Sequence, residues 1–446
     1  MKQLLRNSAF ICIFITGVFS VWLCGNLGGF SKNKIAFDVI SYHSYLPALF
    51  IEKDIRLQFY KTNTQNLVDE GRYWANFTKE GEPVIKTTYG LSAMYFPFTV
   101  WPLLFSDPQH GYEIPFSIAI SVSNLFYYLM SLFILWGVLH KLKFSNLSIG
   151  LSIMCIGLGT NLLSYASIAV GMPHAYNFFL ISALLYLYLN WEEKGGIHRS
   201  ILLGIVIGLL VLIRPTNILF SLVLFSKHLN RNFIQFISGK LIHLLIIGIT
   251  GFLIILPQLL YWKMISGHYF YNSYVNEHFF FNNPHIIDYL FGFRKGWFIY
   301  SPLILLGIFG LIRYRISNPF FMVSVFIILA FIYLNSSWWC WWFGGSHGAR
   351  AMIETYPLLA IGFAGFIDGI KVKYRKPSWY ILGFFILFNL KSVDLYRANI
   401  IHFDSMTPKA FAYTTFKLFF TEEDKAYLKT LYKAPDYEKA LRGEDT

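Results

Sequence analysis

One acidic residue occupies a position where a general base could face a membrane surface. Asp38 follows the first apolar segment and precedes a cluster that contains Tyr42, His43 and Tyr45. A carboxylate is ionised at neutral pH and can take a proton from a hydroxyl group. Asp is also favoured in the first turn of a helix. The position of Asp38 therefore fits either a catalytic base or a helix cap.

Four basic residues are candidates for holding an anionic group such as a phosphate. Arg presents a planar fork to phosphate, whereas Lys acts as a point charge. Arg294 and Arg350 are therefore stronger candidates than Lys295 or Lys86. For Lys86, which lies shortly before Tyr89 and an apolar segment, the alternative is a side chain that extends to the membrane interface.

Two further polar residues lie at breaks between apolar segments. Arg214 precedes Pro215 between two short apolar runs, and an arginine at membrane depth is costly and often functional. It could equally cap the carboxyl end of a helix. His174 follows Gly171-Met-Pro at the start of another run, where it is either a hydrogen-bonded interfacial residue or part of a substrate cavity.

A Trp-rich turn near residue 340 carries the remaining candidates. Trp342 belongs either to the aromatic belt of a membrane protein or to a surface that stacks on a sugar. Arg350 and Glu354 are spaced i, i+4, so they could pair with each other or contact a substrate. His347 precedes them in the same turn. The turn is therefore a second candidate site.

The composition identifies the environment in which these residues act. The chain has 446 residues, of which 55% are hydrophobic and 14% charged, whereas soluble proteins carry about 25% charged residues. Apolar stretches long enough to cross a bilayer recur from Leu4 to Leu390. This pattern excludes a set of soluble domains and predicts an all-α polytopic membrane protein. The formal charge of +13 is explained by Lys and Arg in cytoplasmic loops, so no nucleic-acid partner is predicted.

The apolar runs predict about eleven spans, within a range of 10 to 13. The expected spans lie at 7–27, 115–140, 147–166, 172–191, 201–213, 216–226, 241–263, 298–313, 319–335, 351–370 and 378–391. Lys and Arg concentrate in the loops near 141–143, 194–199, 227–240, 313–315 and 371–376, which places the amino terminus in the cytoplasm. Residues 28–114 then form a large first extracytoplasmic loop.

Two parts of the chain stand apart from plain spans. In the first loop, Ser92–Phe105 is apolar but short and contains Pro97 and Pro102, which predicts a re-entrant or interfacial segment. Residues 1–391 make up the transmembrane domain. The tail, 392–446, is less apolar, and its sequence from Thr421 to Asp424 predicts a capped helix. We expect two or three extracytoplasmic surface helices there.

The cysteines indicate neither disulfides nor a metal centre. The four cysteines are widely separated, and His268, His278 and His285 have no zinc-ligand spacing. No metal ligand is predicted. Assistance from a divalent metal nevertheless stays open, because two neighbouring acids would favour it and only Asp38 is placed.

Several motifs together resemble those of the GT-C membrane glycosyltransferases, which use polyprenyl-phosphate sugars. They include the acid after the first span, Tyr-x-Tyr-Leu-Pro, Lys-x-x-Tyr-Gly-Leu, the Arg-Pro-Thr-Asn break, Arg-Lys-Gly-Trp and Trp-Trp-x-Gly-Gly. The likeness is to the bacterial protein O-mannosyltransferase and aminoarabinose transferase branches, in glycosyltransferase family 39, and it covers residues 1–391. Thr88-Tyr89-Gly90 departs from the family's Tyr-Pro-Pro, and the first acid is single.

The resemblance implies an inverting glycosyltransferase of the bacterial plasma (inner) membrane. Asp38 would then be the general base for a glycan, lipid or protein acceptor on the extracytoplasmic face. Tyr42, His43, Tyr45 and the basic and aromatic residues above would contact the substrate. The alternative is a transporter or flippase of lipid-linked saccharide that performs no catalysis. A transporter should carry ionisable residues across the membrane, and the predicted spans contain few Asp or Glu residues.

The predicted orientation can be tested by cysteine labelling in cells. Single cysteines introduced in the 28–90 loop and the 392–446 tail should react with an impermeant thiol reagent from outside. Cysteines at 192–199 and 371–376 should react only after the membrane is permeabilised. The chain without an introduced cysteine provides the background. Labelling of the 371–376 loop in intact cells would contradict the orientation.

Overall fold

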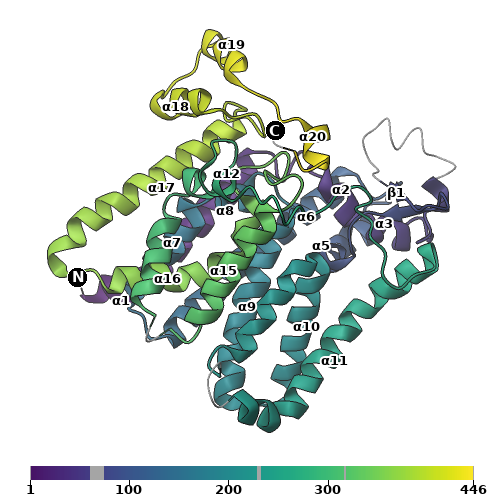
Figure 1. Cartoon of the computed structure of the whole chain (residues 1–446), viewed down its shortest axis with the longest axis horizontal. Helices are drawn as coiled ribbons and strands as arrows, with labels where there is room; N and C mark the ends of the chain where they lie inside the picture. Colours follow the sequence, from purple (N-terminus) through teal and green to yellow (C-terminus); the bar gives the residue numbers. More distant parts are fainter. Residues whose placement is uncertain (1, 61–74, 229–232, 316–317, 445–446) are drawn as a thin grey trace. The chain divides into compact units, whose positions relative to one another are not determined.

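The computed structural model describes residues 2–60, 75–228, 233–315 and 318–444 (Figure 1). Within these ranges the chain is mainly helical, and its strands form one two-stranded sheet. Five of the described helices are long and apolar enough to cross a membrane. The prediction of a helical membrane protein is therefore confirmed at this level.

The chain divides into two compact units. Unit 1 comprises residues 1–18, 135–165 and 276–446, and unit 2 comprises 19–134 and 166–275. Three of the four boundaries fall inside helices, namely α1 (Lys2–Asn26), α6 (Ile114–Lys141) and α8 (Leu162–Ser167). Each unit is thus assembled from segments that are distant in sequence.

Unit 2 contains most of the predicted first loop and the helices that follow it. Its remaining elements are α2 (Asp38–His43), α3 (Tyr45–Phe50), β1 (Ala75–Phe77), β2 (Pro83–Ile85), α5 (Gly90–Phe105), α9 (Pro173–Lys194), α10 (Ile197–Ile213), the 3-10 helix η1 (Pro215–Phe225) and α11 (Phe233–Ser266). The β1–β2 hairpin is antiparallel, and Asn76 pairs with Val84. The part of this loop at 61–74 lies outside the described residues.

The predicted re-entrant segment is a continuous helix. Pro97 and Pro102 lie inside α5, although an interior proline removes one main-chain hydrogen bond and usually bends or ends a helix. The hydroxyl of Ser106 donates to the carbonyl of Pro102 at 2.6 Å and helps to close the last turn. The prolines therefore do not end this helix, and its re-entrant or interfacial place relative to the membrane stays a prediction.

Helices α10 and α11 lie side by side in unit 2 (Figure 1). Gly204 and Gly208 lie one turn apart on α10, and a Cβ atom at Gly204 would come within 2.6 Å of the carbonyl oxygen of Ile247. Small residues at this spacing allow membrane helices to approach closely. The glycines therefore fix how α10 packs on α11.

Unit 1 contains the remaining helices. They are α7 (Asn146–Gly159), α12 (Ile286–Phe291), α13 (Trp297–Tyr300), α14 (Ile304–Arg313), α15 (Phe321–Ser336), η2 (Arg350–Thr355), α16 (Tyr356–Asp368), η3 (Val372–Tyr374), α17 (Arg375–Arg397), α18 (Pro408–Phe416), α19 (Glu422–Leu431) and α20 (Tyr437–Leu441). Helix α16 packs against α7 and α14, and the hydroxyl of Ser152 on α7 donates to the carbonyl of Ala360 at 2.7 Å.

The tail packs on unit 1 as three short helices. The predicted boundary at 391/392 falls inside α17, which continues to Arg397, so the tail begins later than expected. The predicted cap is confirmed, because the Thr421 side chain accepts from the main chain of Asp424 and the Asp424 carboxylate accepts from that of Thr421. Ile401, Met406 and Leu428 join a buried apolar cluster with Tyr300.

The five long helices correspond to the spans expected at 7–27, 115–140, 241–263, 351–370 and 378–391. Most of the other expected spans are shorter apolar helices, and the one at 147–166 breaks after Gly159. A helix such as α14, with 10 residues, is about 15 Å long, half the thickness of a bilayer core. The count of about eleven spans therefore stays a prediction.

The contact between α14 and α16 generates a stability prediction. A Cβ atom at Gly310 would overlap the carbonyl oxygen of Gly362. Gly310→Ala should therefore separate the helices and cost about 1–3 kcal/mol. Gly383→Ala on α17 is the matched control, because nothing lies within 4 Å of its Cβ position. Thermal unfolding in detergent should show a lower midpoint for Gly310→Ala only, and equal midpoints would contradict the close packing.

Candidate functional site

The predicted site residues fall into two groups, one in each unit. Unit 2 holds Asp38, Tyr42, His43, Tyr45, Lys86, Tyr89, His174 and Arg214. Unit 1 holds Arg294, Lys295, Trp342, His347, Arg350 and Glu354.

Asp38 is the first residue of α2 and is half-buried. Phe37, which precedes it, has a φ of 51°, a left-handed conformation that is rare for a bulky residue and costs about 1–3 kcal/mol. Asp38 thus lies in a first helical turn, as the cap interpretation predicted, and keeps partial exposure, as a base requires. Tyr42, one turn further along α2, is also half-buried.

His43 and Tyr45 are buried and bonded within the protein. The Nε2 atom of His43 lies 2.7 Å from the carbonyl oxygen of Gly111, and burial lowers the pKa of His43 to about 4, so its ring is neutral at pH 7. The hydroxyl of Tyr45 donates to the carbonyl of Thr87 at 2.9 Å and accepts from Nε2 of Gln258 at 3.1 Å. These contacts join α2 to the loop before α6, and α3 to the segment after β2 and to α11.

Lys86 follows β2 and remains partly exposed. Its Nζ lies 4.8 Å from the centre of the Tyr274 ring, a cation–π distance. Its carbonyl accepts a hydrogen bond from the hydroxyl of Ser273. Tyr89, three residues later, donates from its hydroxyl to the carbonyl of Ile254 on α11. Lys86 therefore retains an accessible charge, whereas Tyr89 is committed to the fold.

The two residues at predicted helix breaks lie where expected. Arg214 joins α10 to η1 in an extended conformation, with φ of −150°. The hydroxyl of Thr88 donates to the carbonyl of Leu212 beside this break, so the break lies next to the segment that carries Lys86. His174 is buried in the first turn of α9. A substrate role for either residue stays a prediction.

Unit 1 gathers three basic residues. Arg294 and Lys295 lie in the turn between α12 and α13, and Arg350 begins η2. Lys295 is 1% exposed, and burial, reinforced by the positive charges of Arg350 and Arg294, lowers its pKa to about 7. Its Nζ donates to the carbonyl of Ser346. This bond and the contact of Arg294 with the Trp342 ring bring positions 294 and 295 to the turn that leads into Arg350.

A carboxylate that the sequence interpretation did not select partly balances these cations. Asp404 is buried, and its charge raises the pKa values of Arg294 and Lys295 against the effect of burial. Its Oδ2 accepts from the hydroxyl of Tyr437 at 2.8 Å, and its Oδ1 accepts from that of Ser405 at 2.6 Å. One guanidinium nitrogen of Arg294 also donates to the main-chain carbonyl of Asp404, at 3.2 Å.

Aromatic side chains enclose one side of this basic cluster, defined here as Arg294, Lys295 and Arg350. The Arg294 guanidinium lies 5.3 Å from the centre of the Trp342 ring. Trp342 is 1% exposed, and its indole nitrogen lies 3.5 Å from the hydroxyl of Tyr437. In this structure Trp342 therefore stacks on a guanidinium inside the protein rather than standing in an aromatic belt.

His347 is buried between hydroxyl groups. Its Nδ1 lies 2.7 Å from the hydroxyl of Ser164, and its Nε2 lies 2.9 Å from that of Ser392. Burial and the charge of Lys295 lower the pKa of His347 to about 3, so the ring stays neutral. Its ring stacks on Tyr396 at 4.9 Å. We assign His347 to positioning the turn that carries Arg350.

Arg350 and Glu354 do not lie on an α-helix in this fold. The two residues lie in η2, a 3-10 helix, where residues at i and i+3 share a face and i+4 is rotated away. Whether Arg350 and Glu354 pair with each other or contact a substrate stays a prediction. Glu354 is completely buried within unit 1.

Taken within its unit, the basic cluster has the properties of an anion-binding group. Lys295 is buried, Arg294 and Arg350 are partly exposed, and Asp404 acts on Arg294 and Lys295, so basic side chains gather where water is limited and electrostatic attraction is strong. Asp404 and Tyr437 lie more than 100 residues from Arg294 in sequence. No local sequence motif marks Asp404 or Tyr437 as part of the cluster. Covariation between the tail and the segment that carries Arg294 is the sequence signal that could identify them.

No metal site accompanies the cluster in the described part of the chain. Among residues 2–60, 75–228, 233–315 and 318–444, no group of three or more His, Cys, Asp or Glu side chains is arranged to hold a metal ion. The question of assistance from a divalent metal accordingly stays open.

No protein-family model matches the chain, and a search of curated proteins finds no significant match. The resemblance to GT-C glycosyltransferases therefore rests on the motifs given above.

The depressed pKa of Lys295 predicts a pH-dependent stability. Between about pH 7 and pH 10.5, the folded protein has released a proton that the unfolded chain retains. The free energy of unfolding should therefore rise with pH in this window, by at most about 1.4 kcal/mol per pH unit. Lys295→Met should lack this rise. The difference between the thermal midpoints of the two proteins should change from pH 7 to pH 10. A constant difference would contradict the lowered pKa of Lys295.

Proposed function

We propose that the chain is a GT-C-like glycosyltransferase that moves a sugar from a polyprenyl phosphate to an acceptor. The observation that carries this proposal is the convergence of Arg294, Lys295 and Arg350 in a membrane protein. A buried cation is costly unless it is paired. Three basic side chains gathered in one unit are well suited to a substrate that supplies negative charge itself.

The chemistry of such a donor suits this arrangement. The acceptor oxygen attacks the anomeric carbon, the bond from that carbon to the phosphate oxygen breaks, and the electron pair leaves with the polyprenyl phosphate. Negative charge therefore develops on the phosphate, where fixed cations lower the barrier. Direct displacement inverts the anomeric centre. Arg294 and Arg350 contribute planar forks to this phosphate, and Lys295 contributes a point charge.

The proton released by the acceptor goes to Asp38 in this proposal. Two observations support the choice: Asp38 is partly exposed at the start of α2, and the preceding Phe37 adopts a strained conformation. Strained residues concentrate at functional sites, where surrounding structure holds them in place. Lys86, partly exposed in the same unit, is proposed as an additional substrate contact.

The membrane arrangement belongs to the same proposal. We place about eleven spans in a bacterial plasma membrane, with a cytoplasmic amino terminus and an extracytoplasmic site. Support comes from the loop charges and from the five long apolar helices, which match predicted spans. The sugar and the acceptor are defined only as classes: a hexose or pentose, and a glycan, lipid or protein.

Transfer from a panel of radiolabelled polyprenyl-phosphate sugars, assayed with purified protein in liposomes, tests the activity and the base together. Asp38→Asn keeps the size of the side chain and removes its charge, so turnover should fall by about 10²–10⁴-fold while donor binding is retained. Asn occupies helix starts about as well as Asp, so a purely structural Asp38 predicts near-native transfer.

A matched pair of basic variants separates the phosphate contacts from general charge effects. Arg350→Gln should lower transfer by about 10²–10³-fold through weaker stabilisation of the leaving phosphate. Lys409→Gln removes an exposed charge on α18 and should leave transfer unchanged. If wild-type protein transfers no sugar but carries the labelled lipid across the liposome membrane, the proposal fails in favour of a flippase.

A further inference from the structure

The turn between α18 and α19 presents three large apolar side chains on the surface of unit 1. Phe416, Leu418 and Phe419 are 87%, 73% and 84% exposed. Single exposed apolar residues are ordinary, but three within four positions form a patch of the kind that marks an interaction surface. The turn lies outside the helices that are long enough to cross a membrane.

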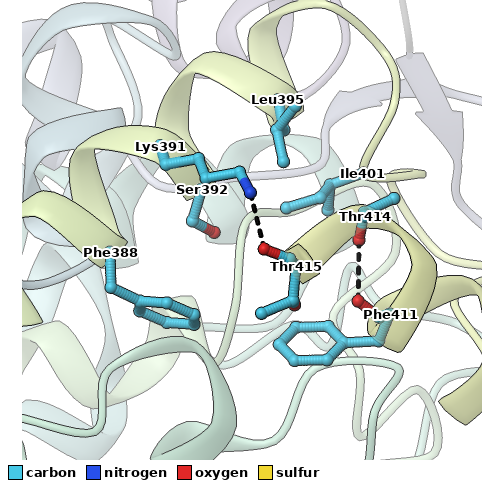
Figure 2. Close-up of a pocket in the computed structure, with 8 residues that line it drawn as sticks. All are labelled: Phe388, Lys391, Ser392, Leu395, Ile401, Phe411, Thr414 and Thr415. Carbon is cyan, nitrogen blue, oxygen red and sulfur yellow. Dashed lines mark hydrogen bonds between the residues drawn. The ribbon is translucent and has the colours of Figure 1, made fainter. Parts of the chain in front are cut away.

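Hydrogen bonds hold this turn at both ends. On one side, the Nζ atom of Lys391 on α17 donates to the carbonyl of Thr415 at 2.6 Å, as Figure 2 shows. On the other side, the Nζ atom of Lys417 binds the carboxylate of Asp424. The capping box of Thr421 and Asp424 then begins α19. The apolar side chains are therefore displayed outward by a fixed turn.

The patch continues an exposed apolar stripe on α17. Tyr380, Phe384 and Leu387 are all exposed and lie at i, i+4 and i+7, on one face of that helix. Lys391 follows on the same face, four residues after Leu387, and its bond to Thr415 fixes the end of α18 where the stripe ends (Figure 2). Because α17 belongs to a candidate membrane span, this face is the one that lipid would cover.

We propose that residues 416–419 insert into the lipid–water interface and anchor the tail to the membrane surface. Phe and Leu side chains next to Lys are typical of segments that lie in this interface. The partner is the bilayer itself, because the patch continues a face already suited to lipid. The inference does not depend on the proposed glycosyltransferase activity.

Depth-dependent quenching on the full chain tests this insertion. Phe419→Cys and, separately, Leu418→Cys are labelled with an environment-sensitive fluorophore and reconstituted in phosphatidylcholine liposomes. The native cysteines are buried, so the introduced thiol reacts preferentially. Lys429→Cys is the matched control, because Lys429 is exposed on α19 of the same tail and has no apolar neighbourhood of this kind.

Lipids that carry a nitroxide near the headgroup should quench the labels at 418 and 419 at least about threefold more than the label at 429. Aqueous iodide should quench in the opposite order. Equal quenching at all three sites would overturn the proposal. Shielding from iodide without quenching by lipid would also overturn it and would indicate a protein surface instead. A failure of sugar transfer would leave this result unaffected.

Discussion

At several places in the described part of the chain, side chains bond main-chain carbonyl groups that are left open where helices end or bend. A polar main-chain group in an apolar environment costs several kcal/mol if it is unsatisfied, so membrane proteins must provide partners for it. Asn389 on α17 donates to the carbonyls of Leu158 and Thr160, at 2.7 and 2.8 Å, where α7 ends. Asn217 donates to the carbonyl of Leu210 at 3.1 Å where α10 gives way to η1. The short and broken helices depend on these bonds.

Burial and hydrogen bonding distinguish some of the predicted site residues of unit 2 from others. Tyr45 and Tyr89 use their hydroxyl groups on main-chain carbonyls, and His43 bonds a carbonyl as well. These three were predicted as substrate contacts by residue type and position. Asp38 and Lys86 keep partial exposure in the same unit and are therefore the better candidates for contact with a substrate.

The sequence predicted the elements well where hydrophobicity is continuous. The span expected at 115–140 is α6, Ile114–Lys141, and the cap at Thr421 forms as written. The sequence did not predict features that depend on contacts between distant residues or on very short elements. Strands of three residues have too little alternation to be recognised, and the carbonyl groups at the end of α7 are bonded by Asn389, which lies 230 positions after Gly159. The basic residues were selected as candidates by residue type and position, but their common location depends on tertiary contacts.

The charge balance of the basic cluster links the fold of the tail to the proposed chemistry. Asp404, the carboxylate near Arg294 and Lys295, comes from the tail, and Tyr437 at the start of α20 holds it in place. The segment that sequence patterns described only as surface helices therefore contributes part of the electrostatics of unit 1. Removing the tail would leave cations buried without that partner, which costs more than the loss of surface packing alone. A tail fixed in this way acts as a structural component of the basic cluster.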